Sequence, residues 1–427
     1  MTERRVALAA IVVGVLWAGC AEVDPIDVRV FDPDQNSGSA DFSILVAVGN
    51  SLAAGYQNNG IAEGRQRMGH TALVARQVGK VVFSGPTVLS RRDEFVLPGV
   101  TDPGTVGTLR LVNLVPPALE PVSVAEAGVP LNTFYPDSFN NLAVPGANVN
   151  DVINTATFAF NPFYDLVLRN RGTMLEQADD LQPTFVVLWV GGNDILGKLT
   201  NNVAVTPLAD FETDYRTIVE TLVGLESRPD LVTANIPDFT RLPFAATVPP
   251  FLVDPKTQEP VLVEGQMVPL LGPNGPLNLP GPESPGDLVT VAAIPLLEMG
   301  VGIPRPFGTG APLPDVVVLD LAEITAIREA TEAFNAVIAD VAATHGIPVV
   351  DAAALFDEAI AGIVLGGVVH NTDFITGGLI GLDGVHPTDL GHAVLANAFL
   401  EVINDAYGAS IPGLDLSEFV GTAPPGP

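Results

Sequence analysis

Short runs of residues that are apolar throughout alternate with helical patterns along most of this chain. A strand buried on one face alternates apolar and polar residues, whereas a strand buried on both faces is apolar at nearly every position. The second pattern is present at residues 42–49, 184–190, 230–236, 316–321 and 347–351. Such runs are typical of a mainly parallel sheet covered by helices, so the sequence predicts a three-layer α/β/α domain.

Two helices can be predicted in more detail. Between the last two runs, apolar residues recur at helical spacing from Ile327 to Val341, with charged residues elsewhere on the surface. Residues 388–403 form another helical pattern, and Thr388 is suited to cap its N-terminus. Both helices fit the expected alternation of strands and helices.

Two stretches rich in proline and glycine interrupt this alternation, at about residues 81–137 and 239–314. A structureless loop of that length is uncommon within a compact domain unless it is functional or has a small structure of its own. We interpret both as insertions into one domain that spans residues 42–412, followed by a flexible tail at 413–427. The second insertion is also apolar, so it either roofs a cleft at the sheet edge or packs there for stability alone.

The N-terminus has the pattern of an export signal, in which a pair of arginines precedes an apolar run. The run ends in small residues before Cys20, and this end resembles the lipobox of bacterial lipoproteins, with Trp17 where leucine is usual. We therefore expect residues 1–20 to be a lipoprotein signal peptide, Cys20 to carry lipid, and residues 21–41 to be a tether. The expected location is the cell envelope, on the periplasmic side or the outer surface. An ordinary secretory signal that contains a cysteine is the alternative.

The composition excludes some classes of partner. The chain has 49 acidic and 19 basic residues and a formal net charge of -30, so it repels nucleic acid and anionic lipid headgroups. Its single cysteine excludes both an internal disulfide and a cysteine-based zinc site. Because of its acidic charge, we expect the chain to have no nucleic-acid partner.

Four short motifs contain the groups that ester hydrolysis needs, namely a nucleophile, a base, a group that orients the base, and donors for the oxyanion. The first motif is Gly49-Asn50-Ser51-Leu52, directly after the first predicted strand. Ser51 should lie at a helix N-terminus, where backbone N–H groups and the helix dipole favour negative charge. A simple helix cap is the alternative role for Ser51.

The second and third motifs offer hydrogen-bond donors. Gly146 follows a short apolar run and could present its N–H to a ligand because no Cβ blocks the approach. The sequence Gly191-Gly192-Asn193-Asp194 follows the second predicted strand, and the amide of Asn193 could point at an oxyanion. An ordinary turn is the alternative for each motif.

The fourth motif is Asp383-Gly384-Val385-His386, immediately before the last predicted helix. This spacing allows Asp383 to accept a hydrogen bond from one ring nitrogen of His386 while the other nitrogen faces the nucleophile. The remaining histidines lack this arrangement, and we interpret them as structural. An Asp-Gly turn without catalytic function is the alternative.

In this order, the four motifs resemble the serine, glycine, Gly-x-Asn-Asp and Asp-x-x-His blocks of the SGNH hydrolases, also called the GDSL esterase/lipase family. The resemblance implies a flavodoxin-like α/β/α fold with no metal or organic cofactor. It also implies that Ser51 attacks the ester, that His386 acts as general base and then acid, and that Asp383 orients His386. The oxyanion hole would be formed by the N–H of Ser51, the N–H of Gly146 and the side chain of Asn193.

The activity implied by the resemblance is that of a serine esterase or lipase that forms an acyl-enzyme. Its expected partners are an ester substrate, such as a lipid, and the membrane that holds the anchor. An acyltransferase to a sugar or lipid hydroxyl, and a non-catalytic binding lipoprotein, are the alternatives. Asn50 stands where family members usually have Asp, which keeps the shape of the side chain and removes a charge beside the nucleophile.

Overall fold

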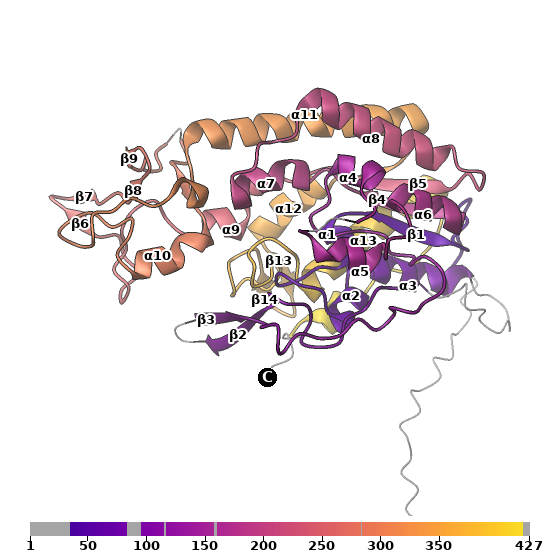
Figure 1. Cartoon of the computed structure of the whole chain (residues 1–427), viewed down its shortest axis with the longest axis horizontal. Coiled ribbons are helices and arrows are strands. Elements are labelled where there is room, and N and C mark those ends of the chain that lie inside the picture. The colour runs from indigo at the N-terminus through magenta and orange to yellow at the C-terminus, as the bar shows by residue number, and fades with distance from the viewer. Residues whose placement is uncertain (1–34, 83–94, 115–116, 158–159, 283, 422–427) are drawn as a thin grey trace, which may run out of the picture. The chain divides into compact units, whose positions relative to one another are not determined.

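A four-stranded parallel sheet forms the centre of the fold (Figure 1). The strands follow the order β1 (Leu45–Gly49), β4 (Phe185–Trp189), β5 (Asp230–Ala234) and β12 (Val349–Val350). Every neighbouring pair is parallel, and all residues of β1 and β4 are buried. The computed structural model describes residues 35–82, 95–114, 117–157, 160–282 and 284–421.

Helices cover both faces of this sheet. Alternate residues of β4 point to opposite sides, so that Val186 and Leu188 join one hydrophobic core while Val187 and Trp189 join the other. The first core is completed by α4 (Val149–Asn154), α5 (Pro162–Val167), α6 (Met174–Leu181), α8 (Leu208–Val223) and α11 (Leu321–His345). The second is completed by α3 (His70–Val82), α12 (Ala352–Ala361) and α13 (Asp389–Tyr407). The predicted three-layer α/β/α fold is confirmed.

The two helices predicted in detail are present and have well-defined ends. Helix α11 begins after Asp320, which forms a capping box with Glu323, and it ends at Gly346 in the left-handed region. Helix α13 begins after Thr388, whose side chain accepts a hydrogen bond from the N–H of Gly391. The predicted cap at Thr388 is therefore confirmed, and the capping residues set both helix lengths.

One predicted strand is wrong as a member of the parallel sheet. Within residues 316–321, only β11 (Val318–Leu319) is a strand, and it pairs antiparallel with β10 (Leu288–Val289). The position beside β5 is taken by β12 instead. An apolar run indicates burial but does not specify its partner, and here a segment of the second insertion supplies that partner.

The stretch at 239–314 has small elements and a core of its own. The elements are η2 (Phe239–Arg241), α9 (Pro243–Ala246), β6 (Leu262–Val263), β7 (Gln266–Met267), β8 (Leu271–Gly272), β9 (Gly275–Pro276), β10, η3 (Val291–Ala293) and α10 (Ile294–Glu298). Buried Leu270, Leu277, Val289 and Leu313 pack together in a cluster separate from the two cores on the sheet. Many apolar side chains of this stretch are therefore buried against one another.

The remaining elements are short. They are α1 (Ser51–Ala54), α2 (Glu63–Arg67), β2 (Leu109–Leu114), β3 (Pro117–Pro121), α7 (Asn193–Asn201), η4 (Asp315–Val317), β13 (Ile363–Leu365), β14 (Val368–His370) and η5 (Leu416–Phe419). The pair β2–β3 is the hairpin of the first predicted insertion. Phe419 is buried in the core beside α13, so packed residues continue past the boundary that we predicted at residue 412.

The predicted signal peptide, Cys20 and most of the tether lie outside the described residues, and the domain boundaries stay predictions. No helix in the described part of the chain combines the length and apolarity needed to cross a membrane. The same residues contain no group of three or more His, Cys, Asp or Glu placed to hold a metal ion.

Candidate active site

Ser51 lies where the first strand turns into a helix. Gly49 ends β1 so close to β4 that a Cβ would lie 2.2 Å from the carbonyl oxygen of Trp189, which only glycine tolerates. Asn50 then caps α1, because its Oδ1 accepts a hydrogen bond of 3.1 Å from the N–H of Leu52. The capping position therefore belongs to Asn50, and the alternative role of Ser51 as a simple cap is wrong. Asn at this position makes the hydrogen bond that the cap requires.

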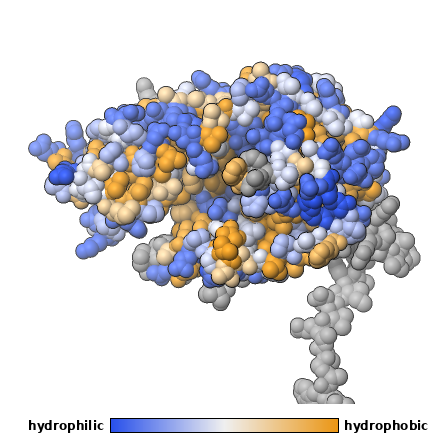
Figure 2. Space-filling view, viewed as in Figure 1, coloured by the Kyte–Doolittle hydropathy of each residue, from blue (hydrophilic) through white to orange (hydrophobic). Residues whose placement is uncertain are grey.

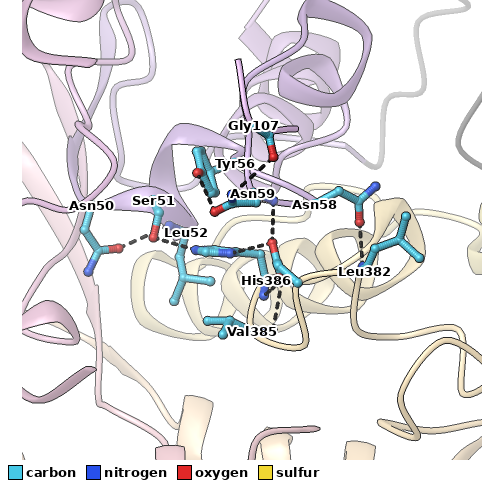
Figure 3. Close-up of polar contacts among 11 residues, drawn as sticks. Asn50, Ser51, Leu52, Tyr56, Asn58, Asn59, Gly107, Leu382, Val385 and His386 are labelled. Carbon is cyan, nitrogen blue, oxygen red and sulfur yellow. Dashed lines mark hydrogen bonds and ion pairs between the residues drawn. The ribbon is translucent and has the colours of Figure 1, made fainter. Parts of the chain in front are cut away.

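His386 joins Ser51 to Asp383. Its Nε2 is 2.9 Å from Ser51 Oγ, and its Nδ1 is 2.9 Å from Asp383 Oδ2. Figure 3 shows the imidazole of His386 extending toward Ser51 from the loop before α13. Ser51 and His386 are 6% and 8% exposed, so their contact is shielded from bulk water. The structure thus brings together the three residues that the first and fourth motifs predicted.

The carboxylate of Asp383 is held by backbone donors as well as by His386. Its Oδ1 accepts hydrogen bonds from the N–H groups of Val385 and His386, at 2.9 and 2.8 Å. Its Oδ2 accepts one from the N–H of Asn59, at 2.7 Å. Burial alone would raise the pKa of Asp383, but the interaction with His386 and these hydrogen bonds outweigh it and hold the pKa below its ordinary value. Asp383 is therefore ionised at neutral pH.

A turn after α1 supports this loop, and the sequence analysis missed it. Asn58 and Asn59 both have left-handed backbones, with φ of 51° and 63°. Asn58 Oδ1 accepts a hydrogen bond of 2.7 Å from the N–H of Leu382, and the Asn59 side chain accepts one from the Tyr56 hydroxyl (Figure 3). The Tyr56 ring packs edge-on against His386, with 4.7 Å between ring centroids. The sequence Asn58-Asn59-Gly60 was the available signal, since asparagine and glycine tolerate positive φ best.

Gly146 reaches the site on a segment that runs beside β1. The N–H groups of Leu142 and Val144 donate to the carbonyl oxygens of Ala47 and Gly49, at 2.9 and 3.1 Å. This pairing extends the sheet edge irregularly and ends just before Gly146, whose φ is 88°. A non-glycine residue would be strained in that conformation. In this position Gly146 lines the same cleft as Ser51.

Asn193 and Asp194 are the first two residues of helix α7. Asn193 Nδ2 donates a hydrogen bond of 2.9 Å to the carbonyl oxygen of Ala147, and Asn193 lines the cleft beside Ser51. The carboxylate of Asp194 accepts hydrogen bonds from the N–H of Val149 and the hydroxyl of Thr206, at 3.1 and 2.8 Å. Burial raises the pKa of Asp194 to about 7, although these hydrogen bonds oppose the rise.

Two of the remaining histidines, His70 on α3 and His392 on α13, form a buried pair. The rings of His70 and His392 are stacked with centroids 5.7 Å apart, and both residues are completely buried. Burial lowers the pKa of His70 to about 3 and that of His392 well below its ordinary value. Both are therefore neutral, and neither lines the described part of the cleft.

The cleft above Ser51 has a volume of about 1270 Å³. Its polar centre consists of Ser51, Gly146, Asn193, Asp383 and His386. Around that centre the lining is mostly apolar and includes residues of α5, of the β2–β3 hairpin and of the 239–314 stretch. The arrangement combines a serine, a histidine that can accept its proton, and space for an apolar ligand.

A family model described as GDSL-like lipase/acylhydrolase matches residues 45–399. The chain belongs to this family. It is therefore a hydrolase of the esterase type, and the matched span contains all four motifs of the GDSL resemblance. A comparison with curated proteins finds no match.

Solved structures similar to this GDSL-family chain share little of its sequence. An α/β hydrolase from the metagenome of Lake Arreo, Spain, is 14% identical, with 86% of this chain and 96% of that chain covered and a TM-score of 0.37. A protein from Parabacteroides merdae described as a GDSL-like lipase is 12% identical, with coverages of 87% and 99% and a TM-score of 0.37. An acetylxylan esterase from Geobacillus stearothermophilus is 14% identical, with coverages of 87% and 96% and a TM-score of 0.37.

Proposed function

We propose that this GDSL-family hydrolase is a serine esterase or lipase that cleaves carboxylic esters through an acyl-enzyme. The observation that carries the proposal is the hydrogen-bonded row of Ser51, His386 and Asp383 at the centre of a mostly apolar cleft. A serine hydroxyl becomes nucleophilic when a neighbouring base takes its proton, and His386 Nε2 lies at the distance that this transfer needs.

The proposed reaction has two halves. In the first, His386 takes the proton of Ser51 as Oγ attacks the carbonyl carbon, and it then gives that proton to the departing alcohol. In the second, His386 takes a proton from water as the water attacks the acyl-enzyme, and it returns the proton to Ser51 Oγ. Asp383 stabilises the positive imidazole in both halves and fixes the ring orientation.

The oxyanion would be stabilised by donors from three residues that line the same cleft. The proposed donors are the N–H of Ser51, the N–H of Gly146 and Nδ2 of Asn193. The two backbone N–H groups have no protein acceptor among the described residues, and Asn193 keeps one amide hydrogen beyond that given to Ala147. Donors that are fixed before the reaction stabilise developing charge without reorganisation.

The proposal is tested by replacing Ser51 and His386 separately with Ala. Loss of such a group costs on the order of 10⁶ in kcat in a serine protease, and we expect a comparable loss in the hydrolysis of a short nitrophenyl ester. Labelling with a fluorophosphonate should also disappear in Ser51→Ala. Circular dichroism would establish that each variant is folded. A folded Ser51→Ala variant with substantial turnover would contradict the mechanism.

We also propose that Cys20 carries a lipid anchor that holds the enzyme at the cell envelope. Support comes from the export-signal pattern and the small residues before Cys20. Several buried acyl chains hold a protein firmly, because each buried CH₂ contributes about 0.8 kcal/mol. Cys20→Ser should therefore release active enzyme from the membrane fraction. A wild-type protein found wholly in the soluble fraction would exclude the anchor.

A further inference from the structure

One wall of the catalytic cleft is formed by the 239–314 stretch. The turn η3 and helix α10 bring Val291, Ala292 and Ile294 to the cleft lining, and Ile294 is 37% exposed. The stretch is also attached to the catalytic loop, since the N–H of Phe244 donates a hydrogen bond of 2.9 Å to the carbonyl oxygen of Gly384. Figure 2 shows hydrophobic residues gathered over the α9–α10 segment and in the hollow beside it.

A second apolar hollow adjoins the cleft on another side. It has a volume of about 620 Å³, and its lining includes Val100, Val106, Ala127 and Leu166. It shares four lining residues with the catalytic cleft, namely Tyr56, Asn59, Pro162 and Phe163. The Tyr56 ring contacts Phe163 on one side, with centroids 5.4 Å apart, and His386 on another. The Tyr56 ring therefore lies between the hollow and the imidazole of His386.

Positive charge is scarce in the linings of both spaces. The described lining of the cleft contains no Lys or Arg. The described lining of the second hollow contains Arg169, but its guanidinium donates to the carbonyl oxygens of Tyr135 and Asp137 and lies 3.9 Å from the Phe139 ring centroid. An anionic group such as phosphate would find no Lys or Arg in the described lining of the cleft, and in that of the hollow only Arg169, which already donates to two carbonyl oxygens. The protein also carries a net charge of -30.

We propose, on the basis of the serine esterase mechanism, that the substrate is an uncharged ester with sizeable apolar groups on both sides of the ester bond. The acyl and alcohol groups extend in different directions from the carbon that Ser51 attacks. One group would lie against the wall of Val291, Ala292 and Ile294, and the other would enter the hollow beside Tyr56 and Phe163. A small acetyl group or a hydrated sugar would leave one of these apolar spaces unfilled.

Two series of esters test the proposal. One series consists of ethyl esters of acids of increasing length, and the other of acetate esters of alcohols of increasing length. In the wild-type enzyme, kcat/KM should rise with chain length in both series, because each methylene buried in an apolar pocket increases discrimination by roughly tenfold or more. A rise in only one series would overturn the proposal.

Two matched variants test which group of the substrate, acyl or alcohol, occupies each space. Ala292→Phe would fill the cleft wall and Ala127→Phe the second hollow, and each should lower the ratio of long to short substrates about 10–100-fold in one series only. The affected series should differ between the two variants. Ala343→Phe, on the exposed side of α11, is the control and should leave both ratios unchanged. Thermal melting would establish that the variants are folded.

The outcomes separate this proposal from the function on which it rests. Hydrolysis of ethyl acetate that depends on Ser51, together with ratios unchanged in both folded variants, would overturn the two-sided substrate and leave the serine mechanism standing. The two-sided substrate would also be overturned if both variants affected the same series. Hydrolysis that persists in Ser51→Ala would instead refute the mechanism itself.

Discussion

Two shielded carboxylates, Asp383 in the cleft and Asp194 next to Asn193, have opposite electrostatic surroundings. The side chain of Asp383 is 9% exposed, and Asp194 is 3% exposed. Asp383 faces His386 and accepts hydrogen bonds from three backbone N–H groups. His386 and the N–H groups of His386 and Val385 hold its pKa below the ordinary value. Asp194 accepts hydrogen bonds from Val149 and Thr206 and has no cationic partner among the residues that the structure describes, and its pKa is raised to about 7. Burial alone therefore does not determine the charge of a carboxylate, because the partners decide it.

The largest expected difference between the two carboxylates is catalytic. Asp383→Asn should lower kcat about 10⁴-fold, because an amide can hold His386 in the wrong tautomer and cannot stabilise the imidazolium. Asp194→Asn should lower kcat about tenfold at most, since an amide of the same shape can still accept from Val149 and donate to Thr206. Steady-state kinetics with a short ester would measure both. Equal losses in the two variants would mean that Asp194 also takes part in catalysis.

The second difference concerns stability against pH. The folded pKa of Asp194 is raised from 3.8 to about 7, so the folded state keeps a proton that the unfolded state has released, and stability falls as pH rises between these values. The full shift corresponds to on the order of 4 kcal/mol. The pKa of Asp383 is lowered, so its contribution is present above the unfolded pKa and is lost as pH falls through the folded pKa.

Urea unfolding from pH 4 to pH 8 would detect this difference. Relative to wild type, Asp194→Asn should gain stability progressively as pH rises toward 7, because the Asn side chain has no proton to lose. A constant difference between the two proteins across this range would show that Asp194 titrates normally.

The third prediction concerns the donors beside Asp194. Asn193→Ala removes one proposed oxyanion donor and should lower kcat roughly 10²–10³-fold, with a much smaller effect on KM. Asn150→Ala is the matched control, because Asn150 is exposed and donates to Asp214. An Asn193→Ala variant that changes KM alone would place Asn193 in ground-state binding instead.

The smallest effect is expected at Asn58, which holds the loop of Asp383. Asn58→Ala removes the acceptor for the N–H of Leu382 and places at φ 51° a residue that tolerates positive φ less well than Asn does, so it should cost about 1–3 kcal/mol of stability and lower kcat a few-fold. Asn58→Gly also lacks the acceptor but tolerates the backbone conformation. Chemical denaturation of both variants would separate the hydrogen bond from the strain. Two variants as stable as wild type would rule out this supporting role.

The sequence predicted the residues whose position follows from a local pattern. Ser51 and Asn193 come directly after apolar strands, and His386 comes directly before a capped helix, so their places at the sheet edge could be inferred. The turn at Asn59 had a local signal, but its hydrogen bond to Asp383 could not be inferred, because it uses a backbone N–H, which every residue except proline has. The charge state of Asp194 was also inaccessible, since it depends on burial and on Val149 and Thr206, which are distant in sequence.

The residues that surround His386 come from opposite ends of the chain. Ser51 and His386 are 335 positions apart, and Asn59 and Asp383 are 324 apart. Because closing so long a loop is entropically costly, these contacts depend on the intervening sheet and helices being in place. During synthesis Ser51 emerges early, and the proposed mechanism requires it to stay inactive until His386 has followed and the chain has folded around the sheet. Recovery of esterase activity would therefore report the completion of folding, later than signals from secondary structure alone.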